Sequence, residues 1–349
     1  MRRRTLIEIG LAVAGTTVAA GCLGDAETGN NGDSAPMFDQ PQYSEWIPAT
    51  TRANENGVLF THLNWQTVAE LDNGEGDEDE LDGIEDVPIL GLPLYGSILT
   101  PLALFGIAFY PFSDVIIPAD GQPADGISTT EMTLADTVVV FDGEYDVSVF
   151  EAQYTDGFEA VEESNGFTVF EGVDEFTDDL AYAVSRETVV VGMTPGEDDE
   201  YVPSEELSAA LDRVATERDR VVDVDNGQWL FETTGSADMV FGAWETDDLF
   251  EQLESEDSQE TDPAESEPDI DDANPVFDDV ESVVNTLSFD IEREEVTTLE
   301  ARFAGIYPEG FVPSEAEVRD HLIGSEEIPH EIIINEPRVH ATATFDSPE

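Results

Sequence analysis

Short apolar stretches, some of them alternating with polar residues, recur along the chain after residue 57 and favour β-strands. Turn-forming pairs separate several of these stretches. Asp142-Gly143 predicts a hairpin with a type I′ turn, and Arg186-Glu187 predicts a second hairpin. A longer hairpin is expected around Arg293. In chain order, the expected strands span residues 58–63, 137–141, 145–150, 167–170, 180–185, 188–193, 238–244, 283–291, 296–303 and 339–345.

Short helices are expected between these strands, because capping residues precede stretches of helical periodicity. Ser204 is the expected N-cap of a helix that ends near residue 217, with acidic residues suited to its positive end. Ser314 and Glu317 have the spacing of a capping box. The expected helices span residues 66–71, 156–164, 204–217, 246–253 and 314–322.

The order of these elements predicts an α+β fold made of two packed units of antiparallel sheet with short helices. The first unit is expected at 45–225 and the second at 226–349, the latter carrying an acidic linker at 255–275. Val-Pro-Ser-Glu occurs at 202–205 and again at 312–315, which indicates a possible internal duplication. The repeated sequence is explained equally well if two unrelated helix starts use the same turn and capping residues.

Residues 87–113 carry no charge in 27 consecutive positions. Their length and apolar character would allow a membrane span. Four prolines, including Pro93 and Pro101, argue against one straight helix. We favour a buried apolar loop or short helices that cover the core. Interfacial contact with a membrane and a true span stay open as alternatives.

The first residues of the chain have the organisation of an export signal. Arg3 and Arg4 are followed, after one residue, by the apolar pair Leu6 and Ile7. The apolar stretch that continues to residue 20 is too short to span a bilayer permanently. This arrangement resembles a twin-arginine export signal, although Glu8 stands where that family often has lysine. Secretion by the general pathway stays open.

The small residues Ala19, Ala20 and Gly21 directly precede Cys22, the one cysteine of the chain. This run resembles a lipobox, which implies cleavage after residue 21 and attachment of lipid to Cys22. Polar residues follow up to residue 44 and read as a flexible tether. The resemblance therefore implies an extracytoplasmic protein, anchored by lipid to the outer face of the cytoplasmic membrane.

The charge balance indicates the solvent in which the protein works. The chain has 81 acidic and 12 basic residues and no lysine, so its formal net charge is −69. Hydrophobic residues still make up 40% of the chain, enough to form a core. Molar salt would screen the self-repulsion, since the Debye length then falls to about 3 Å. The composition resembles that of proteins from halophilic archaea. It disfavours nucleic acid as a partner, because no basic patch lies beyond the signal.

The sequence contains few candidates for catalytic or metal-binding residues. The four histidines (His62, His321, His330 and His340) do not have metal-ligand spacing, and no serine-nucleophile motif or phosphate loop occurs. His62 is expected to be a half-buried residue with its hydrogen bonds satisfied, whereas His330 and His340 are expected to be exposed. Arg186 and Arg293 are expected at hairpin tips, where they neutralise neighbouring carboxylates.

No catalytic residue, metal or cofactor is therefore predicted. The expected function is that of a membrane-anchored lipoprotein with a non-catalytic binding or structural role, whose protein or small-molecule ligand the sequence does not name. A solute-binding lipoprotein of a transporter is the alternative, followed by a cell-surface enzyme. The transporter alternative would require two α/β lobes with parallel sheets around a cleft.

Overall fold

A computed structural model describes residues 35–50, 57–67, 87–105, 126–153, 157–174, 177–193, 202–246, 274–277, 279–292 and 295–346. The predicted export signal, Cys22 and most of the tether lie outside these ranges. So do residues 255–273 of the acidic linker expected at 255–275, and all but the first residue of the helix expected at 246–253.

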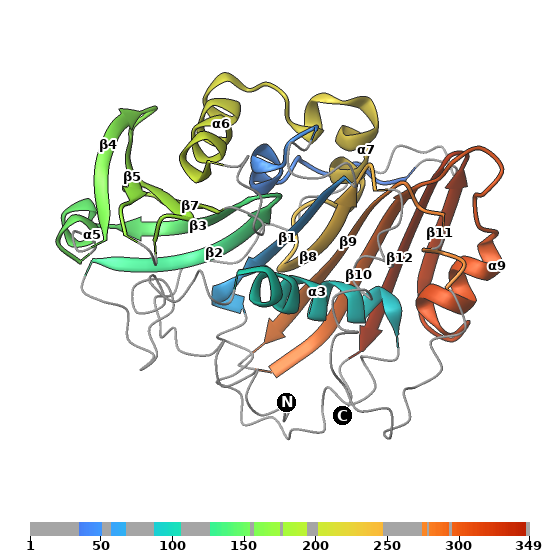
Figure 1. The fold of residues 1–349 in the computed structure, drawn as a ribbon. Helices are drawn as coiled ribbons and strands as arrows, with labels where there is room; N and C mark the ends of the chain where they lie inside the picture. Colours follow the sequence, from blue (N-terminus) through green and yellow to red (C-terminus); the bar gives the residue numbers. More distant parts are fainter. Residues whose placement is uncertain are drawn as a thin grey trace, which may run out of the picture.

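The described strands form one twelve-stranded sheet in the order β11-β12-β10-β9-β8-β1-β2-β3-β7-β6-β5-β4, in which neighbouring strands pair antiparallel (Figure 1). In chain order the strands are β1 (Val58–Asn64), β2 (Ile127–Ala135), β3 (Val138–Tyr145), β4 (Phe158–Ser164), β5 (Phe167–Gly172), β6 (Leu180–Val184), β7 (Thr188–Met193), β8 (Met239–Trp244), β9 (Ser282–Glu292), β10 (Glu295–Ile306), β11 (His330–Asn335) and β12 (Arg338–Asp346).

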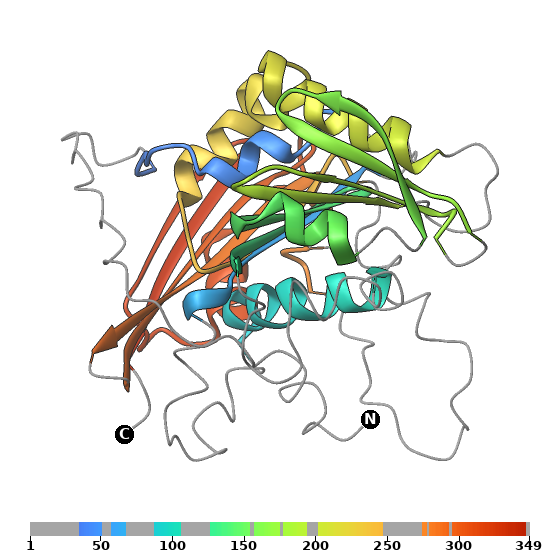
Figure 2. The ribbon, with the colours of Figure 1, turned by 90° about the vertical axis from the view of Figure 1, so that its left-hand side faces the viewer.

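The helical elements lie on both faces of this sheet, with α6, α7 and η1 on one side and α3 on the other (Figures 1 and 2). In chain order they are η1 (Gln42–Trp46), α3 (Pro88–Phe105), α5 (Val147–Gln153), α6 (Pro203–Thr216), η3 (Val221–Asp223), α7 (Asp225–Thr234), α9 (Glu315–Val318) and η4 (Arg319–Ile323). The predicted α+β class is therefore correct in its coarse form, a largely antiparallel sheet with a few short helices.

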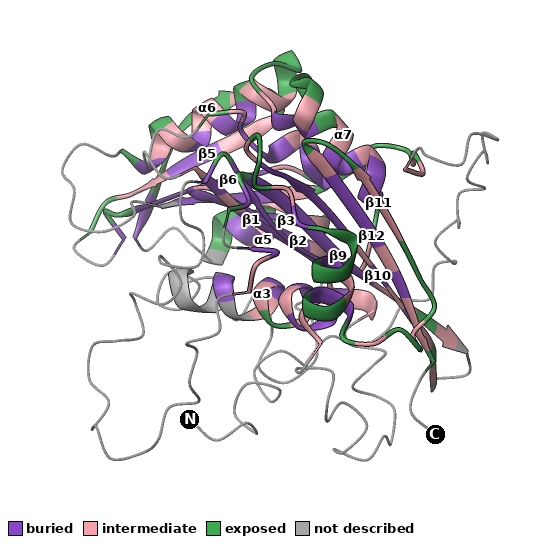
Figure 3. Cartoon of the chain, turned by 90° about the vertical axis from the view of Figure 1, so that its right-hand side faces the viewer, coloured by how far each residue is buried: buried purple, intermediate pink, exposed green. Residues whose placement is uncertain are grey.

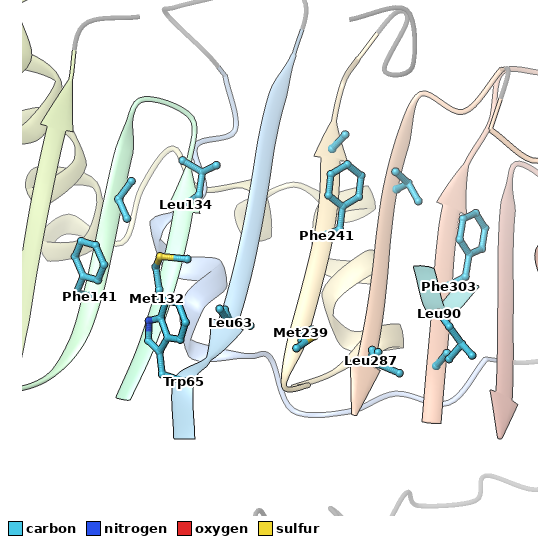
Figure 4. Packing of buried hydrophobic residues seen from close by; sticks show 14 of the residues in the cluster. Leu63, Trp65, Leu90, Met132, Leu134, Phe141, Met239, Phe241, Leu287 and Phe303 are labelled. Atoms are coloured by element: carbon cyan, nitrogen blue, oxygen red, sulfur yellow. The ribbon is translucent and has the colours of Figure 1, made fainter. Parts of the chain in front are cut away.

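Two apolar clusters fill the spaces between these layers, because side chains alternate between the faces of each strand. Leu63 of β1 packs in the cluster that includes Leu90 of α3. Phe60 of the same strand packs in the other cluster, with Leu207 of α6. Figure 3 shows buried positions following the strands between the helix layers, and Figure 4 shows side chains of the α3-side cluster across neighbouring strands.

Strands of the two expected units meet in the middle of the sheet. β1 pairs with β2 on one side and with β8 on the other, so that Leu63 lies opposite both Met132 and Met239. The predicted strands near 58–63, 167–170, 180–193, 238–244, 283–303 and 339–345 are confirmed. β2, β11, η1 and α7 were not predicted from the sequence. The internal duplication is not confirmed and stays a hypothesis.

The hairpin predicted around Asp142-Gly143 is wrong. β3 continues through both residues to Tyr145, and the next residues form the helix α5. The turn of this hairpin lies earlier, where Asp136 adopts a left-handed conformation between β2 and β3. Gly143 is needed inside the strand because a Cβ there would collide with the carbonyl oxygen of Ser128, beside a bulge in the β2–β3 pairing.

The helix predicted at 156–164 is also wrong, because Phe158–Ser164 is the edge strand β4, paired with β5. Five of its seven residues are exposed, so its sequence lacks the alternation of a half-buried strand. The cap predicted at Ser204 is wrong too. Val202 occupies the N-cap position of α6 and Pro203 the first turn, which places Ser204 within the helix. At the related site, Ser314 does form the predicted capping box with Glu317.

Candidate functional site

The helix α3 is the most unusual element of the fold. The expectation of an apolar loop or short helices at 87–113 is wrong in detail, because Pro88–Phe105 forms one helix of 18 residues. Val87 O accepts the amides of Leu90 and Gly91 at its start, both at 2.9 Å. Ser97 Oγ donates to Pro93 O at 2.6 Å, close to the internal proline. Within the described ranges, no helix has both the length and the apolar character needed to cross a bilayer.

One side of α3 packs tightly on the sheet. Ile89 and Leu90 are buried, and Ser97 is fully covered. Gly96 lies against Phe241 of β8 so closely that a Cβ at position 96 would lie 2.8 Å from the ring Cγ. This packing supports the helix despite its internal proline, since most helix stability in proteins comes from tertiary contacts.

The other side of α3 is apolar as well. Leu92 and Ile98 are only partly buried, and Tyr95 is 39% exposed. A surface helix normally has polar residues on its outward face. The predicted role of this segment as a cover of the core agrees with this packing, because Leu92 and Ile98 also pack against the α3-side cluster.

Beneath α3, the sheet contains polar groups without hydrogen-bond partners in the described part of the chain. Asn285 of β9 is fully buried, and neither its amide nitrogen nor its amide oxygen is bonded. Thr61 Oγ1 is also unbonded, and both residues lie opposite Phe241 in the strand register. Unsatisfied buried groups of this kind cost about 1–3 kcal/mol each.

On the opposite face of the sheet, His62 lies under the 3-10 helix η1. Its ring stacks on Tyr43 with centroids 4.4 Å apart, and its Nδ1 lies 3.0 Å from Thr133 Oγ1. The expectation that His62 is satisfied is correct, although it is buried rather than half-buried. Burial lowers the pKa of His62 to about 3, so the ring is neutral and unsuited to acid–base exchange near neutral pH.

Arg302 of β10 holds the first described residues of the chain against this face. Its guanidinium carbon lies 4.2 Å from the centroid of the Phe38 ring, and its Nη1 donates to Thr234 O at 2.8 Å. Glu300 pairs with the same guanidinium at 2.8 Å. Phe38 N also donates to Glu232 O at 2.6 Å. The chain that follows the tether is thus fixed beside α7.

His340 of β12 corrects another expectation. It was expected to be exposed but is 1% exposed, because the β10–β12 pairing places it opposite Ala304 on the face covered by α7. Its Nε2 lies 3.2 Å from Thr342 Oγ1. Burial, and to a lesser extent the positive charge of Arg302, lowers the pKa of His340 to about 4. His330 is exposed, as expected.

A row of polar residues crosses four strands near one end of the sheet face that α6 and α7 cover, and continues to Asp238 just before β8. Asn64 lies opposite Glu131, Glu131 opposite Asp142, and Asp142 opposite Thr188. Asp238, directly before β8, accepts from Asn64 Nδ2 at 3.4 Å. We call Asn64, Glu131, Asp142, Thr188 and Asp238 the carboxylate row.

Each acid of the carboxylate row is partly removed from water. Burial raises the pKa of Glu131, and the negative charges of Asp142 and Asp238 raise it further. Burial also raises the pKa of Asp142 and Asp238, although hydrogen bonds oppose the shift. Thr188 Oγ1 donates to Asp142 at 2.9 Å, and Thr67 Oγ1 to Asp238 at 2.6 Å. The row can therefore retain protons that ordinary surface carboxylates would lose.

This arrangement is not a metal centre. Among the described residues, no three histidine, cysteine, aspartate or glutamate side chains converge as a metal ion would require. Nothing in the sequence marks the carboxylate row, because 81 acidic residues offer very many pairings and only the folded sheet brings these three acids together.

An open groove of about 580 Å³ lies between the β4–β5 hairpin and α6. Val161 and Val202 are exposed along it, at 46% and 44%, and Glu162, Glu205 and Asp212 also line it. Acidic side chains are common over the whole chain, so this lining does not by itself identify a ligand.

The remaining predicted site residues are placed as follows. Arg186 lies exposed at the tip of the β6–β7 hairpin, where it was predicted. Arg293 lies outside the described residues, as do Arg3, Arg4, Leu6, Ile7, Ala19, Ala20, Gly21 and Cys22.

Comparisons with known proteins give little further information. No model of a known protein family matches this sequence, and no curated protein sequence matches it. A solved structure entitled "Structure of crystal form I of TP0453" aligns with 88% of this chain and 94% of that chain, with 10% identity and a TM-score of 0.38. A likeness at this level carries no conclusion about function.

Proposed function

We propose that this chain is an extracytoplasmic lipoprotein, held at the outer face of the cytoplasmic membrane by a lipid on Cys22, with a non-catalytic binding or structural role. The observation that carries the proposal is the run Ala19-Ala20-Gly21-Cys22 behind a twin-arginine pattern. The folded part begins close behind it, since Phe38 is already fixed against Arg302. The folded part would thus lie at the end of a short tether.

The chemistry of the described residues supports a role without catalysis. Burial keeps His62 and His340 neutral, and two acids of the carboxylate row, Asp142 and Asp238, accept hydrogen bonds from threonine hydroxyls. The transporter alternative is less well supported, because the described strands pair antiparallel in one sheet rather than forming two parallel lobes.

We further propose that the protein works in molar salt, as its resemblance to halophilic proteins implies. The internal duplication is also kept as a proposal. It is supported by the repeated Val-Pro-Ser-Glu sequence, which begins α6 in one half and α9 in the other.

The experiment that tests the lipoprotein proposal is the intact mass of the mature protein, purified from the membranes of a haloarchaeal host. We expect an N-terminus at Cys22 that carries covalently bound lipid. Cys22→Ser should abolish the lipid adduct, and exchanging Arg3 and Arg4 for Lys should stop export. A mature chain that retains residues 1–21, or an unmodified Cys22 in the wild type, would overturn the proposal.

A further inference from the structure

The twelve-stranded sheet has two outer strands, β4 and β11, at its opposite ends (Figure 1). The outer side of such a strand presents backbone N–H and C=O groups to which a strand of another chain can bond. Within the described ranges, no strand pairs with the outer side of either one. Proteins usually protect these edges with charged side chains or a β-bulge. An edge that lacks this protection is a candidate surface for pairing with another chain.

The β4 edge has both kinds of protection. Glu159, Glu162 and Glu163 are exposed along this strand of seven residues. The pairing of β4 with β5 also shifts between Ala160 and Glu162, which is the mark of a bulge. A strand from a second copy of so acidic a chain would therefore meet both repulsion and a distorted backbone at β4.

The β11 edge has neither kind of protection. This strand pairs with β12 in an unbroken register along all six of its residues, and Glu331 is its one acid. Three consecutive isoleucines, Ile332, Ile333 and Ile334, follow that acid. Ile332 and Ile334 adjoin the α3-side cluster, which supports one face of the strand. In a chain with a net charge of −69, β11 is thus the edge that a second strand can approach with less repulsion.

The hydrogen bonds between β11 and β12 determine which backbone groups of β11 point outward. Thr344 N donates to Pro329 O at 3.0 Å, directly beside the β11–β12 register. In an antiparallel pair, bonded and non-bonded positions alternate along each strand. The N–H and C=O groups that point away from β12 therefore belong to His330, Ile332 and Ile334. Ile332 is the middle one of these three positions.

We propose that β11 pairs antiparallel with β11 of a second copy of this chain, about a two-fold axis at Ile332. Ile332 then lies opposite Ile332 of the second copy, and His330 lies opposite Ile334. At all three positions the outward N–H and C=O groups bond to the other copy. Glu331 lies opposite the uncharged Ile333, so no carboxylate directly faces another across the pair. This inference does not depend on the proposed lipoprotein function.

The difference between the two edges favours a second copy, and a dimer, over a longer assembly. A two-fold axis uses the same edge in both copies and closes the contact. The outer edge that remains in each copy is β4, whose glutamates and bulge oppose further pairing. The remaining repulsion between the two acidic bodies is screened in molar salt, where the Debye length is about 3 Å.

The experiment measures molar mass by light scattering, at molar salt and over a series of protein concentrations. The chain carries Cys22→Ser, which removes the proposed lipid site and the need for detergent. We expect a dimer that dissociates on dilution. Ile333→Glu places a carboxylate opposite Glu331 of the other copy and should raise the dissociation constant about tenfold or more. Ile333→Lys places a cation there and should recover most of that loss. Val161→Glu, at an exposed position of β4, is the matched control and should have no effect.

A monomer at every concentration would overturn the proposal. So would assemblies larger than two, or a dimer that Val161→Glu weakens, because β4 would then take part in the contact. Equal effects of Ile333→Glu and Ile333→Lys would also overturn it, since position 333 would then not face Glu331. Circular dichroism shows whether each variant is folded.

Hydrogen exchange of the chain without any change in β11 gives a second measurement, which decides the matter if the Ile333 variants do not fold. The outward amides of Ile332 and Ile334 should exchange more slowly as the protein concentration rises, because pairing covers them. The amide of Glu163 in β4 should exchange at the same rate throughout. Exchange at Ile332 and Ile334 that does not depend on concentration would overturn the proposal.

Discussion

Gly96 of α3 and Phe241 of β8 are in van der Waals contact at the point where the apolar helix crosses the sheet. A Cβ at position 96 would lie 2.8 Å from the Cγ atom of the ring. The ring is 2% exposed and is enclosed by the α3-side cluster, so it has little freedom to move away. The position of α3 on the sheet therefore depends on the absence of a side chain at this residue.

Gly96→Ala is expected to destabilise the fold, although alanine favours a helix by about 1 kcal/mol over glycine. Overpacking of a close contact in a core typically costs about 1–3 kcal/mol, which exceeds that gain. Thermal unfolding at molar salt, followed by circular dichroism, would measure the difference. Glu151→Ala, at an exposed position of α5, is the control and should change the unfolding temperature little. An unchanged or raised stability of Gly96→Ala would show that α3 is not packed as described.

Arg302 and Phe38 make the second contact that we expect to matter. Replacing Arg302 with Lys keeps the positive charge but removes the planar guanidinium. That group lies over the Phe38 ring and contacts both Thr234 O and the Glu300 carboxylate. We expect a loss of about 1–3 kcal/mol in unfolding free energy and faster protease cleavage near Phe38. The control is Arg319→Lys, since Arg319 pairs with exposed acids and its replacement should change stability little. Equal effects of the two substitutions would contradict the proposed role of Arg302 in fixing Phe38 against the sheet.

The sequence predicted the sheet far better than its turns. Apolar stretches located most strands because nearly every strand buries one face or, as β6 and β8 do, both faces. The prediction of a turn failed at Asp142-Gly143. The glycine is needed there because a neighbouring backbone comes close, and the sequence does not distinguish such a glycine from one in a turn. The prediction of strands failed at β4 because this edge strand is mostly exposed, so its sequence lacks the apolar positions of a buried face. Only long-range pairing distinguishes these cases.

The single helix at α3 shows a different limit of sequence reasoning. Prolines lower helix propensity locally, but the gain from packing Ile89 and Leu90 on the sheet outweighs that penalty. The carboxylate row could not be predicted from the sequence either, because Glu131 and Asp238 lie more than 100 positions apart and become neighbours only through β1. Residue type alone does not distinguish either acid from the other acids of the chain.

Protonation of His62 gives a prediction for acid stability. The pKa of His62 is about 3 in the folded protein but near 6.5 in the unfolded chain. Between these two pH values the unfolded chain therefore binds more protons. The contribution of His62 to stability is complete above about pH 6.5 and falls as the pH drops towards 3. At pH 5 the loss is about 2 kcal/mol. His62→Phe, which keeps an aromatic ring against Tyr43, should flatten this part of the profile.

Chemical unfolding at molar salt between pH 5 and pH 7 measures that slope. His330→Phe, at an exposed position of β11, is the matched control for the exchange of a histidine ring for a phenyl ring. Equal slopes for the wild type and His62→Phe would show that the buried ring is not the group responsible.

The carboxylate row has the opposite dependence on pH. Burial and the charges of Asp142 and Asp238 raise the pKa of Glu131, so the folded protein binds more protons there than the unfolded chain. Ionisation of Glu131 therefore lowers stability as the pH rises through the range between its unfolded and folded pKa. Glu131→Gln removes this charge and should stabilise the fold at pH 7 by up to about 1 kcal/mol, the usual scale for a pair of like charges on adjacent strands.

The matched control is Glu144→Gln, which removes the same charge from an exposed position of β3. Unfolding free energies of both variants would be compared over a series of salt concentrations, from molar down to the lowest at which the fold persists. Glu144→Gln should help only as salt falls, because an exposed charge is screened at molar salt. Glu131→Gln should keep most of its gain at molar salt, because a partly buried charge is screened much less. If the two variants lost their advantage together as salt rose, the acids of the row would be ordinary surface charges, and desolvation could not be the cause of their raised pKa values.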